Sequence, residues 1–253
     1  MMANNWVSII TPMYNGARYI SETIDSVLKQ TYPYWEMIII DDGSKDNGVE
    51  IVKKYMERDK RIMLIQQTNK GSAAARNNGI REAKGRYIAL LDADDLWEPN
   101  FLESQLTLMK EKNAIVVHAS YRRINEKSEE ILSSFRAKSV VTYKQMRMTN
   151  HIACLTGLYD TSQYGKIYLK EELKSIRDDY AYWLDIVKLA EVAYGNPEIL
   201  ARYRVMASST TGKKKKLIRS QFLFYYNYQH LGLLRSCLYT FYWGILGLRK
   251  FAK

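Results

Sequence analysis

Apolar residues form short uninterrupted runs over the first hundred positions, and longer segments with helical spacing separate these runs. Because the apolar residues follow one another without alternation, each run predicts a strand buried on both faces, as in a parallel sheet. The candidate strands lie at residues 7–10, 36–41, 62–66 and 87–92. The candidate helices lie at about residues 18–30, 46–58, 72–84 and 99–112. This alternation predicts an α/β fold with a mainly parallel sheet flanked by helices.

The pattern is less regular after residue 113. A further strand is expected at residues 114–124, and mixed loop, strand and short helix follow to about residue 175. Residues 177–193 predict a helix that Asp178 or Asp179 can cap. Its apolar stripe is expected to contain Tyr182, Ile186, Leu189 and Ala193. A closing strand is expected at residues 199–205.

Polar clusters follow each of the first four predicted strands. Ligands of parallel α/β sheets bind at the carboxyl ends of the strands, so these clusters should meet at one edge. The clusters are TPMYNG (11–16), DDGSKDN (41–47), NKGSAAARNNG (69–79) and DADD (92–95).

The charge of the chain is concentrated at its C-terminal end. The 253 residues carry a formal net charge of +11 and 47% hydrophobic residues, which fits one large domain or one domain plus an appendage. The segment 212–253 contains nine Lys and Arg residues, ten aromatic residues and no acid. We therefore expect a nearly neutral domain over residues 1–211, followed by a basic tail over residues 212–253.

The DADD cluster places Asp92 and Asp94 on the same side of a strand end. Carboxylates repel phosphate unless a divalent cation such as Mn²⁺ or Mg²⁺ lies between them, and these cations prefer oxygen ligands. The D-x-D spacing therefore predicts a metal-assisted phosphate site. The alternative is an ordinary turn or helix cap, to which Asp95 in particular could belong.

The motifs together resemble the family 2 glycosyltransferases of the GT-A (Rossmann-like) fold. The resemblance rests on VSIITPMYNGARYISETIDSVLKQTYPYWEMIIIDDGSKDN followed by NKGSAAARNNGIREAKGRYIALLDADD, and it continues more weakly through RDDYAYWLDI. It implies an enzyme that uses a nucleotide-activated sugar, most often a UDP-sugar, and inverts the anomeric configuration. It also implies an acceptor in bacterial surface polysaccharide synthesis, such as O-antigen or capsule.

The resemblance divides the expected catalytic domain, residues 1–211, into a nucleotide-sugar-binding half (1–112) and an acceptor-binding half (113–211). It also assigns roles to residues at the expected binding edge. Pro12 and Tyr14 would line the nucleobase pocket, and Asp42 would accept a hydrogen bond from the uracil ring. Arg76 would lie near the base or the diphosphate, although a solvated helix arginine is the alternative. Asp94 would bind the metal directly, while Asp92 would hold the ribose or support the metal.

The resemblance also implies a catalytic base. An inverting transfer needs a group that takes the proton of the attacking hydroxyl. In RDDYAYW this role would fall to Asp179, with Asp178 as the second candidate; the alternative is that both acids only cap the helix. Trp183 could stack on a sugar or pack in the core.

Two features depart from the family pattern. Many relatives have a histidine after the YRV stretch that completes the metal shell, whereas this chain has Met206. The Q-x-x-R-W signature of processive synthases is also missing from the sequence. Transfer of a single sugar is therefore expected.

The basic tail is expected to lie on a membrane surface. Its longest uncharged run, Ser236–Leu248, is 13 residues, short of the ~20 that span a bilayer. Lysines and aromatics together are typical of helices on an anionic membrane, rather than of a nucleic-acid-binding surface. The alternative is packing on the catalytic domain or on a second copy of the chain. We expect the protein at the cytoplasmic side of the plasma membrane, because its two cysteines have no metal-ligand spacing and its first residues do not resemble a secretory signal.

The sequence thus predicts a metal-dependent inverting glycosyltransferase. It would move a hexose or N-acetylhexosamine from a UDP-sugar to the hydroxyl of a glycan acceptor linked to a lipid. Two alternatives are a sugar-nucleotide nucleotidyltransferase and a non-catalytic membrane-bound nucleotide-sugar-binding protein. The first would be expected to carry a Gly-rich loop with Arg or Lys after the first strand, and TPMYNGARY matches that poorly.

Overall fold

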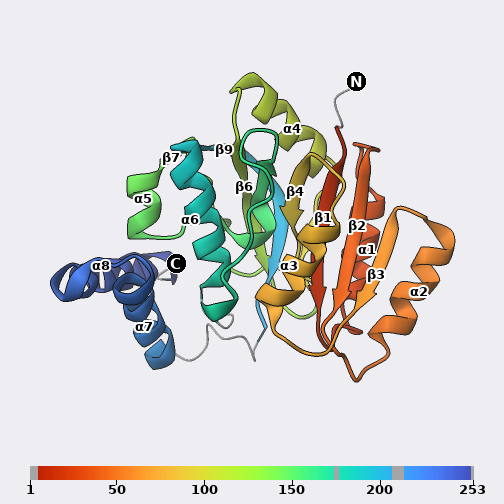
Figure 1. Cartoon of the computed structure of the whole chain (residues 1–253), viewed down its shortest axis with the longest axis horizontal. Coiled ribbons are helices and arrows are strands. Elements are labelled where there is room, and N and C mark those ends of the chain that lie inside the picture. Colours follow the sequence, from red (N-terminus) through yellow and green to blue (C-terminus); the bar gives the residue numbers. More distant parts are fainter. Residues whose placement is uncertain (1–4, 174–176, 207–213, 252–253) are drawn as a thin grey trace.

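The computed structural model describes residues 5–173, 177–206 and 214–251, except for the side chains of 214–216 and 248–251. Within this part of the chain, one nine-stranded sheet forms the centre of the molecule (Figure 1). Its strands are β1 (Val7–Met13), β2 (Trp35–Asp41), β3 (Ile62–Gln66), β4 (Tyr87–Leu90), β5 (Leu96–Trp97), β6 (Val116–Ile124), β7 (Val140–Thr142), β8 (Gly157–Asp160) and β9 (Val192–Arg204).

The sheet has a parallel half and a mixed half. Strands follow the order β3-β2-β1-β4-β8-β6-β9-β5, and β7 pairs with β9. The strands β3, β2, β1 and β4 are parallel to one another, as the uninterrupted apolar runs predict. Beyond β4, β8 is antiparallel to both of its neighbours, while β6 and β9 are parallel. The carboxyl ends of β1, β2 and β4 therefore meet at one edge.

Helices cover both faces of the sheet, because successive strand residues point to opposite sides. Ile9 packs with one apolar cluster, together with residues of α1, α2 and α4, whereas Ile10 packs with another, together with residues of α3 and α6. These helices are α1 (Ile20–Leu28), α2 (Gly48–Arg58), α3 (Ser72–Glu82), α4 (Phe101–Glu111) and α6 (Asp178–Ala190). Short helices α5 (Tyr143–Met148), η1 (Cys154–Thr156) and η2 (Glu171–Leu173) complete this part.

Two predicted elements differ from the structure. The closing strand was expected at residues 199–205, but β9 begins at Val192. The strand contains three residues that are typical of turns, Gly195, Asn196 and Pro197, at an irregularity in its pairing with β6. Because of these residues, the sequence pattern does not predict the first half of the strand. The predicted apolar stripe of α6 also ends early, because Leu189 is 44% exposed and residue 193 belongs to β9.

The C-terminal segment forms α7 (Lys214–Leu223), the π-helical turn η4 (Phe224–Tyr228) and α8 (Gly232–Phe251), beside α5 and α6 (Figure 1). Phe224 and Tyr225 pack in the same apolar cluster as α6, and the Tyr225 hydroxyl donates to the Met148 carbonyl at 2.5 Å. The side chains of the basic run 213–216, which belongs to the predicted membrane-binding tail, lie outside the described part of the chain. Among the described residues, no helix is both long and apolar enough to cross a membrane.

Candidate active site

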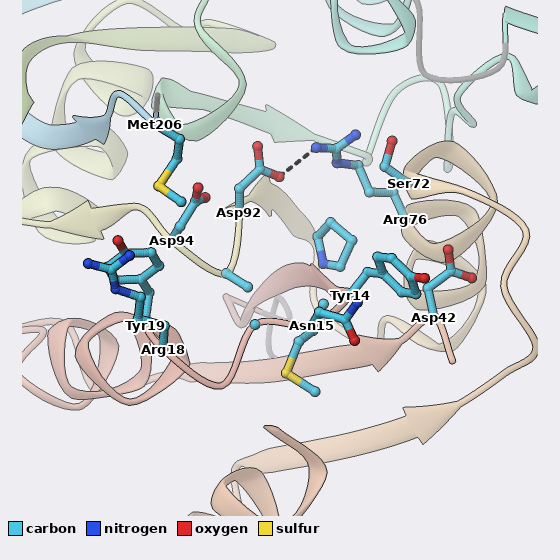
Figure 2. Close-up of a pocket in the computed structure, with 14 residues that line it drawn as sticks. Tyr14, Asn15, Arg18, Tyr19, Asp42, Ser72, Arg76, Asp92, Asp94 and Met206 are labelled. Carbon is cyan, nitrogen blue, oxygen red and sulfur yellow. Dashed lines mark hydrogen bonds and ion pairs between the residues drawn. The ribbon is translucent and has the colours of Figure 1, made fainter. Parts of the chain in front are cut away.

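A cavity of about 430 Å³ opens at the edge where β1, β2 and β4 end. The turns after these strands and the first turns of α3 supply most of its wall (Figure 2). Its lining residues are Pro12, Met13, Tyr14, Asn15, Gly16, Arg18, Tyr19, Asp42, Ser72, Arg76, Asp92, Ala93, Asp94 and Met206. The six residues predicted for the donor, from Pro12 to Asp94, all line this one cavity.

Asp42 lies at one end of the cavity, next to Tyr14 (Figure 2). Its carboxylate accepts hydrogen bonds from the Gln67 side chain and from the backbone N–H groups of Lys70 and Gly71, each at 2.8 Å. Gly71 permits the backbone of this loop to approach the Asp42 carboxylate, because its φ is 90°, a value that residues with a Cβ rarely adopt. Three of about four acceptor positions of the carboxylate are occupied, so one remains for a ligand N–H.

Arg76 joins the donor edge to the first turn of α6. Its Nη2 donates to Asp92 at 2.5 Å and its Nη1 to Asp178 at 3.2 Å. Burial alone would lower the pKa of Arg76, but the neighbouring carboxylates, Asp92 foremost, raise it well above its usual value. Ser72 adds a 3.3 Å hydrogen bond to Asp178. Arg76 is therefore a fixed cation between two segments about a hundred residues apart, and the solvated-arginine alternative is wrong.

Asp94 projects into the cavity beside Met206 (Figure 2). Burial and the negative charge of Asp92 raise the pKa of Asp94 to about 6. Two crowded carboxylates with oxygen donors suit Mg²⁺ or Mn²⁺, which bind proteins through one or two carboxylates and take further oxygens from phosphate and water. Among the described residues, no group of three or more His, Cys, Asp or Glu side chains could hold a metal ion; Asp94 and Asp92 are the carboxylates of the DADD turn that line the cavity.

Asp95 has a structural position. The residue is 1% exposed, and its Oδ1 accepts the backbone N–H of Arg204 at 2.8 Å. Burial, followed by the charge of Asp94, raises its pKa well above the usual value. The helix-cap alternative is wrong, because β5 follows and α4 begins only at Phe101.

Arg204 is a site residue that the sequence analysis did not identify. Its side chain donates to the Asp94 carbonyl at 2.8 Å and to Glu22 at 2.9 Å, and its guanidinium lies 4.3 Å from the Tyr19 ring centroid. It also donates to Ser128, in the turn after β6. Arg204 thus fixes the DADD turn against α1 and β6. The sequence shows an arginine two positions before Met206, but it does not show the partners of this arginine, which lie far away along the chain.

The two acids predicted for catalysis both lie in the first turn of α6, but their surroundings differ. The N-cap is Arg177, so neither acid occupies the predicted capping position, although both lie in the first turn, where a carboxylate complements the helix dipole. Asp178 is buried and paired with Arg76. Asp179 is partly exposed, and no described side chain donates a hydrogen bond to it. Burial and then the charge of Asp178 raise the pKa of Asp179, while Arg76 and Arg177 act in the opposite direction.

Trp183 belongs to the core rather than to a sugar-binding wall. It is fully buried, and a Cβ added at Gly157 would lie 2.3 Å from its ring. Met206, which stands where the resemblance leads us to expect a histidine, lines the cavity with its thioether. Cys154 and Cys237 are both free.

The chain is similar to known glycosyltransferases. A model of Glycosyl transferase family 2 matches residues 8–176. TuaG of Bacillus subtilis (strain 168), a glycosyltransferase named for teichuronic acid biosynthesis, is 36% identical over 92% of this chain and 93% of its own. WfgD of Escherichia coli, a UDP-Glc:α-D-GlcNAc-diphosphoundecaprenol β-1,3-glucosyltransferase, is 37% identical over 85% of this chain and 83% of its own.

A solved structure shares the fold. TarS 1–349 of S. aureus, in complex with UDP-GlcNAc, superposes with a TM-score of 0.70 at 22% sequence identity. The match covers 87% of this chain and 65% of the TarS chain. At this identity the similarity establishes the GT-A fold alone.

Proposed function

Because the chain belongs to Glycosyl transferase family 2 and is therefore a glycosyltransferase, we propose that it transfers a hexose or N-acetylhexosamine from a UDP-sugar to a hydroxyl of a lipid-linked glycan, with inversion. The observation that supports this proposal is the Asp92–Arg76–Asp178 bridge, which connects the wall of the donor cavity to the first turn of α6, where Asp179 would act as the base. Family membership favours transfer over both alternatives, the nucleotidyltransferase and the non-catalytic binder.

The donor half, residues 1–112, would hold the nucleotide. Pro12 and Tyr14 would contact the uracil ring, and Asp42 would accept its N–H with the remaining acceptor position. Arg76 would offset the charge of the diphosphate and order Asp92 near the ribose. UDP-GlcNAc in TarS and UDP-Glc in the name of WfgD support a UDP-sugar for this chain.

Asp94, supported by Asp92, would hold a divalent cation. When Mn²⁺ or Mg²⁺ is bound, it supplies positive charge to the diphosphate leaving group. The crowding that raises the pKa of Asp94 supports this assignment, because a cation would relieve the repulsion between the two carboxylates.

The reaction would proceed by direct displacement. The acceptor hydroxyl oxygen attacks the anomeric carbon, the bond from that carbon to the diphosphate oxygen breaks, and UDP leaves with the bonding electrons. Asp179 takes the hydroxyl proton. Its raised pKa strengthens it as a base compared with an ordinary aspartate, and Asp178, engaged by Arg76, keeps the turn in place.

The acceptor would bind the half formed by residues 113–211, close to a membrane. WfgD acts on a diphosphoundecaprenol-linked sugar, which supports a lipid-linked acceptor and a place in surface polysaccharide synthesis. The tail from 213 to 253 would lie on the anionic inner surface of the plasma membrane, with exposed Leu234 and Phe241 entering the interface. Deleting residues 213–253 should release the protein from membranes; unchanged recovery with membranes would reject this contact.

The transfer itself can be tested by UDP release from a panel of UDP-sugars and lipid-linked acceptors. Wild-type protein should release UDP in an acceptor-dependent and EDTA-sensitive way, and Asp179→Asn should not. Equal release by both proteins would reject Asp179 as the base, and EDTA insensitivity would reject the metal role of Asp94.

A further inference from the structure

Arg177 connects the catalytic turn to the C-terminal helix. It is the N-cap residue of α6, two positions before Asp179, and its guanidinium carbon lies 5.1 Å from the centroid of the Trp243 ring in α8. Its backbone is left-handed, with φ 62°. A long side chain rarely adopts this conformation, and such strain is often retained where function needs it.

The charge of Arg177 has no ion-pair partner among the described residues. Its Nε and Nη2 atoms are buried and have no hydrogen-bond acceptor in that part of the chain. Three other guanidinium groups near the site, those of Arg18, Arg76 and Arg204, each pair with a carboxylate. A largely desolvated guanidinium without hydrogen-bond acceptors is costly, and the charge of nearby Asp179 offsets only part of that cost, so the Arg177 side chain is prepared for a further anion that donates acceptor oxygens.

The position of Arg177 indicates which anion this is. It does not line the donor cavity, where Arg76 and the DADD acids would hold the diphosphate of UDP. On one side of Arg177 lies Asp179, which must approach the acceptor hydroxyl. On the other side lies α8, whose outer residues Leu234, Leu238 and Phe241 are 58 to 75% exposed. An acceptor whose sugar reaches Asp179 would bring its charged linkage to Arg177, and its lipid would extend past Trp243 and around α8 to these exposed residues.

We propose that Arg177 binds the phosphate group that links the acceptor sugar to its lipid carrier. The inference rests on the proposed lipid-linked acceptor and adds the residue that recognises its linkage. The planar guanidinium can donate two parallel hydrogen bonds to a phosphate once its side chain rotates, and Trp243 supports the guanidinium from the opposite side. A membrane phospholipid offers the same phosphate chemistry, but its headgroup has no reason to lie beside the base.

Binding of a simple prenyl diphosphate tests this without knowledge of the acceptor sugar. Farnesyl diphosphate and farnesol would be titrated calorimetrically, in detergent, into full-length protein saturated with UDP and Mn²⁺, so that the donor cavity is occupied. Wild type should bind farnesyl diphosphate about tenfold to a hundredfold more tightly than farnesol, the range of a charge-assisted contact. Arg177→Gln should lose most of that difference.

The control is Arg147→Gln, which removes another guanidinium at the junction with the C-terminal helices. Arg147 lies 5.9 Å from the Tyr143 ring and contacts Gln229, away from the base. It should bind farnesyl diphosphate like wild type. Asn tolerates a left-handed backbone, so Arg177→Asn serves as a second variant if Arg177→Gln does not fold.

Three outcomes would overturn the inference. The first is a wild type that does not distinguish farnesyl diphosphate from farnesol, and the second is an Arg177 variant that distinguishes them like wild type. The third is an Arg177→Gln protein that loses binding to phosphatidylglycerol vesicles in parallel, since the phosphate would then be a headgroup. These titrations involve no sugar transfer, so failure of the proposed function, seen as absent UDP release, is recognised separately.

Discussion

The donor edge and the first turn of α6 both place acidic and basic side chains around Arg76, but they differ in how far these side chains satisfy one another. At the donor edge, Asp42 accepts three hydrogen bonds and Asp92 pairs with Arg76. In the first turn of α6, Asp178 is paired, whereas Asp179 receives no hydrogen bond from a described side chain and Arg177 has no ion-pair partner there.

This difference separates residues that position from residues that act. A charged group with a complete set of partners is held in one place, and its chemistry is already used within the protein. A partly buried charge without partners is destabilising, so its retention indicates a ligand or a reaction step that supplies the missing partner. By this criterion we propose that Asp178 positions the turn and that Asp179 reacts.

The largest expected effect comes from exchanging these two neighbours for their amides. Asp179→Asn should lower the turnover rate by about 10²- to 10⁴-fold, the usual contribution of a general base, while UDP affinity stays unchanged. Its stability at neutral pH should equal or exceed that of wild type, because burial disfavours the charged form of Asp179. Single-turnover transfer and thermal melting measure the two effects.

Asp178→Asn is the matched variant and should show the opposite balance. It weakens the hydrogen bonds of Arg76 and Ser72, so the free energy of unfolding should fall by about 1–3 kcal/mol. An Asp178→Asn protein that is fully stable, with turnover as low as that of Asp179→Asn, would assign the base to Asp178.

Arg204 tests whether the paired part of the site is a rigid frame. Arg204→Met removes contacts to Glu22, Ser128 and the Asp94 carbonyl, and unfolding should become easier by about 2–4 kcal/mol. Arg202→Met is the control on the same strand; it removes a partly exposed pair with Glu98, worth at most about 1 kcal/mol. The free energies of unfolding measured in urea should therefore differ clearly between the two variants. Similar losses in both would contradict the role of Arg204 in holding the site rigid.

Asp42 tests the donor end with a smaller effect. Asp42→Asn exchanges one acceptor oxygen for an amino group that faces backbone N–H donors, so UDP should bind about tenfold to a hundredfold more weakly. The control is Asp46→Asn, because Asp46 also accepts backbone N–H groups, from Ala17 and Gly48, but does not line the cavity. Calorimetric titration with UDP should find the control unaltered, and equal weakening in both would remove the special role of Asp42.

The donor half could be predicted from the sequence because its information is local. Each apolar run predicted a strand, and the polar residues directly after β1, β2 and β4 had to meet where parallel strands end. The order β4-β8-β6-β9 could not be predicted, because β8 is only four residues long and β9 contains Gly195 and Pro197, which are typical of turns.

The site was predictable to the extent that its residues stand in motifs. Tyr14, Asp42, Arg76 and Asp94 were all expected at the binding edge, and all line its cavity. Arg204 and Arg177 were not, because their significance depends on partners far away in the sequence: Glu22 for the first and Trp243 for the second. The resemblance already favoured Asp179 over Asp178 as the base, but the physical difference between them, the pairing of Asp178 with Arg76, depends on a contact far away in the sequence.

The pH dependence of single-turnover transfer tests the central claim, that Asp179 is the base, most directly. The base acts in its ionised form, and burial together with Asp178 raises its pKa, so activity should be full at higher pH and should fall as the pH drops through that raised pKa. With saturating UDP-sugar, acceptor and Mn²⁺, the midpoint of this fall should lie above about 3.9, the ordinary value for Asp. The residual rate of Asp179→Asn should lack this fall. A wild-type rate that stays constant down to the ordinary range of an aspartate, or an identical fall in Asp179→Asn, would contradict the account.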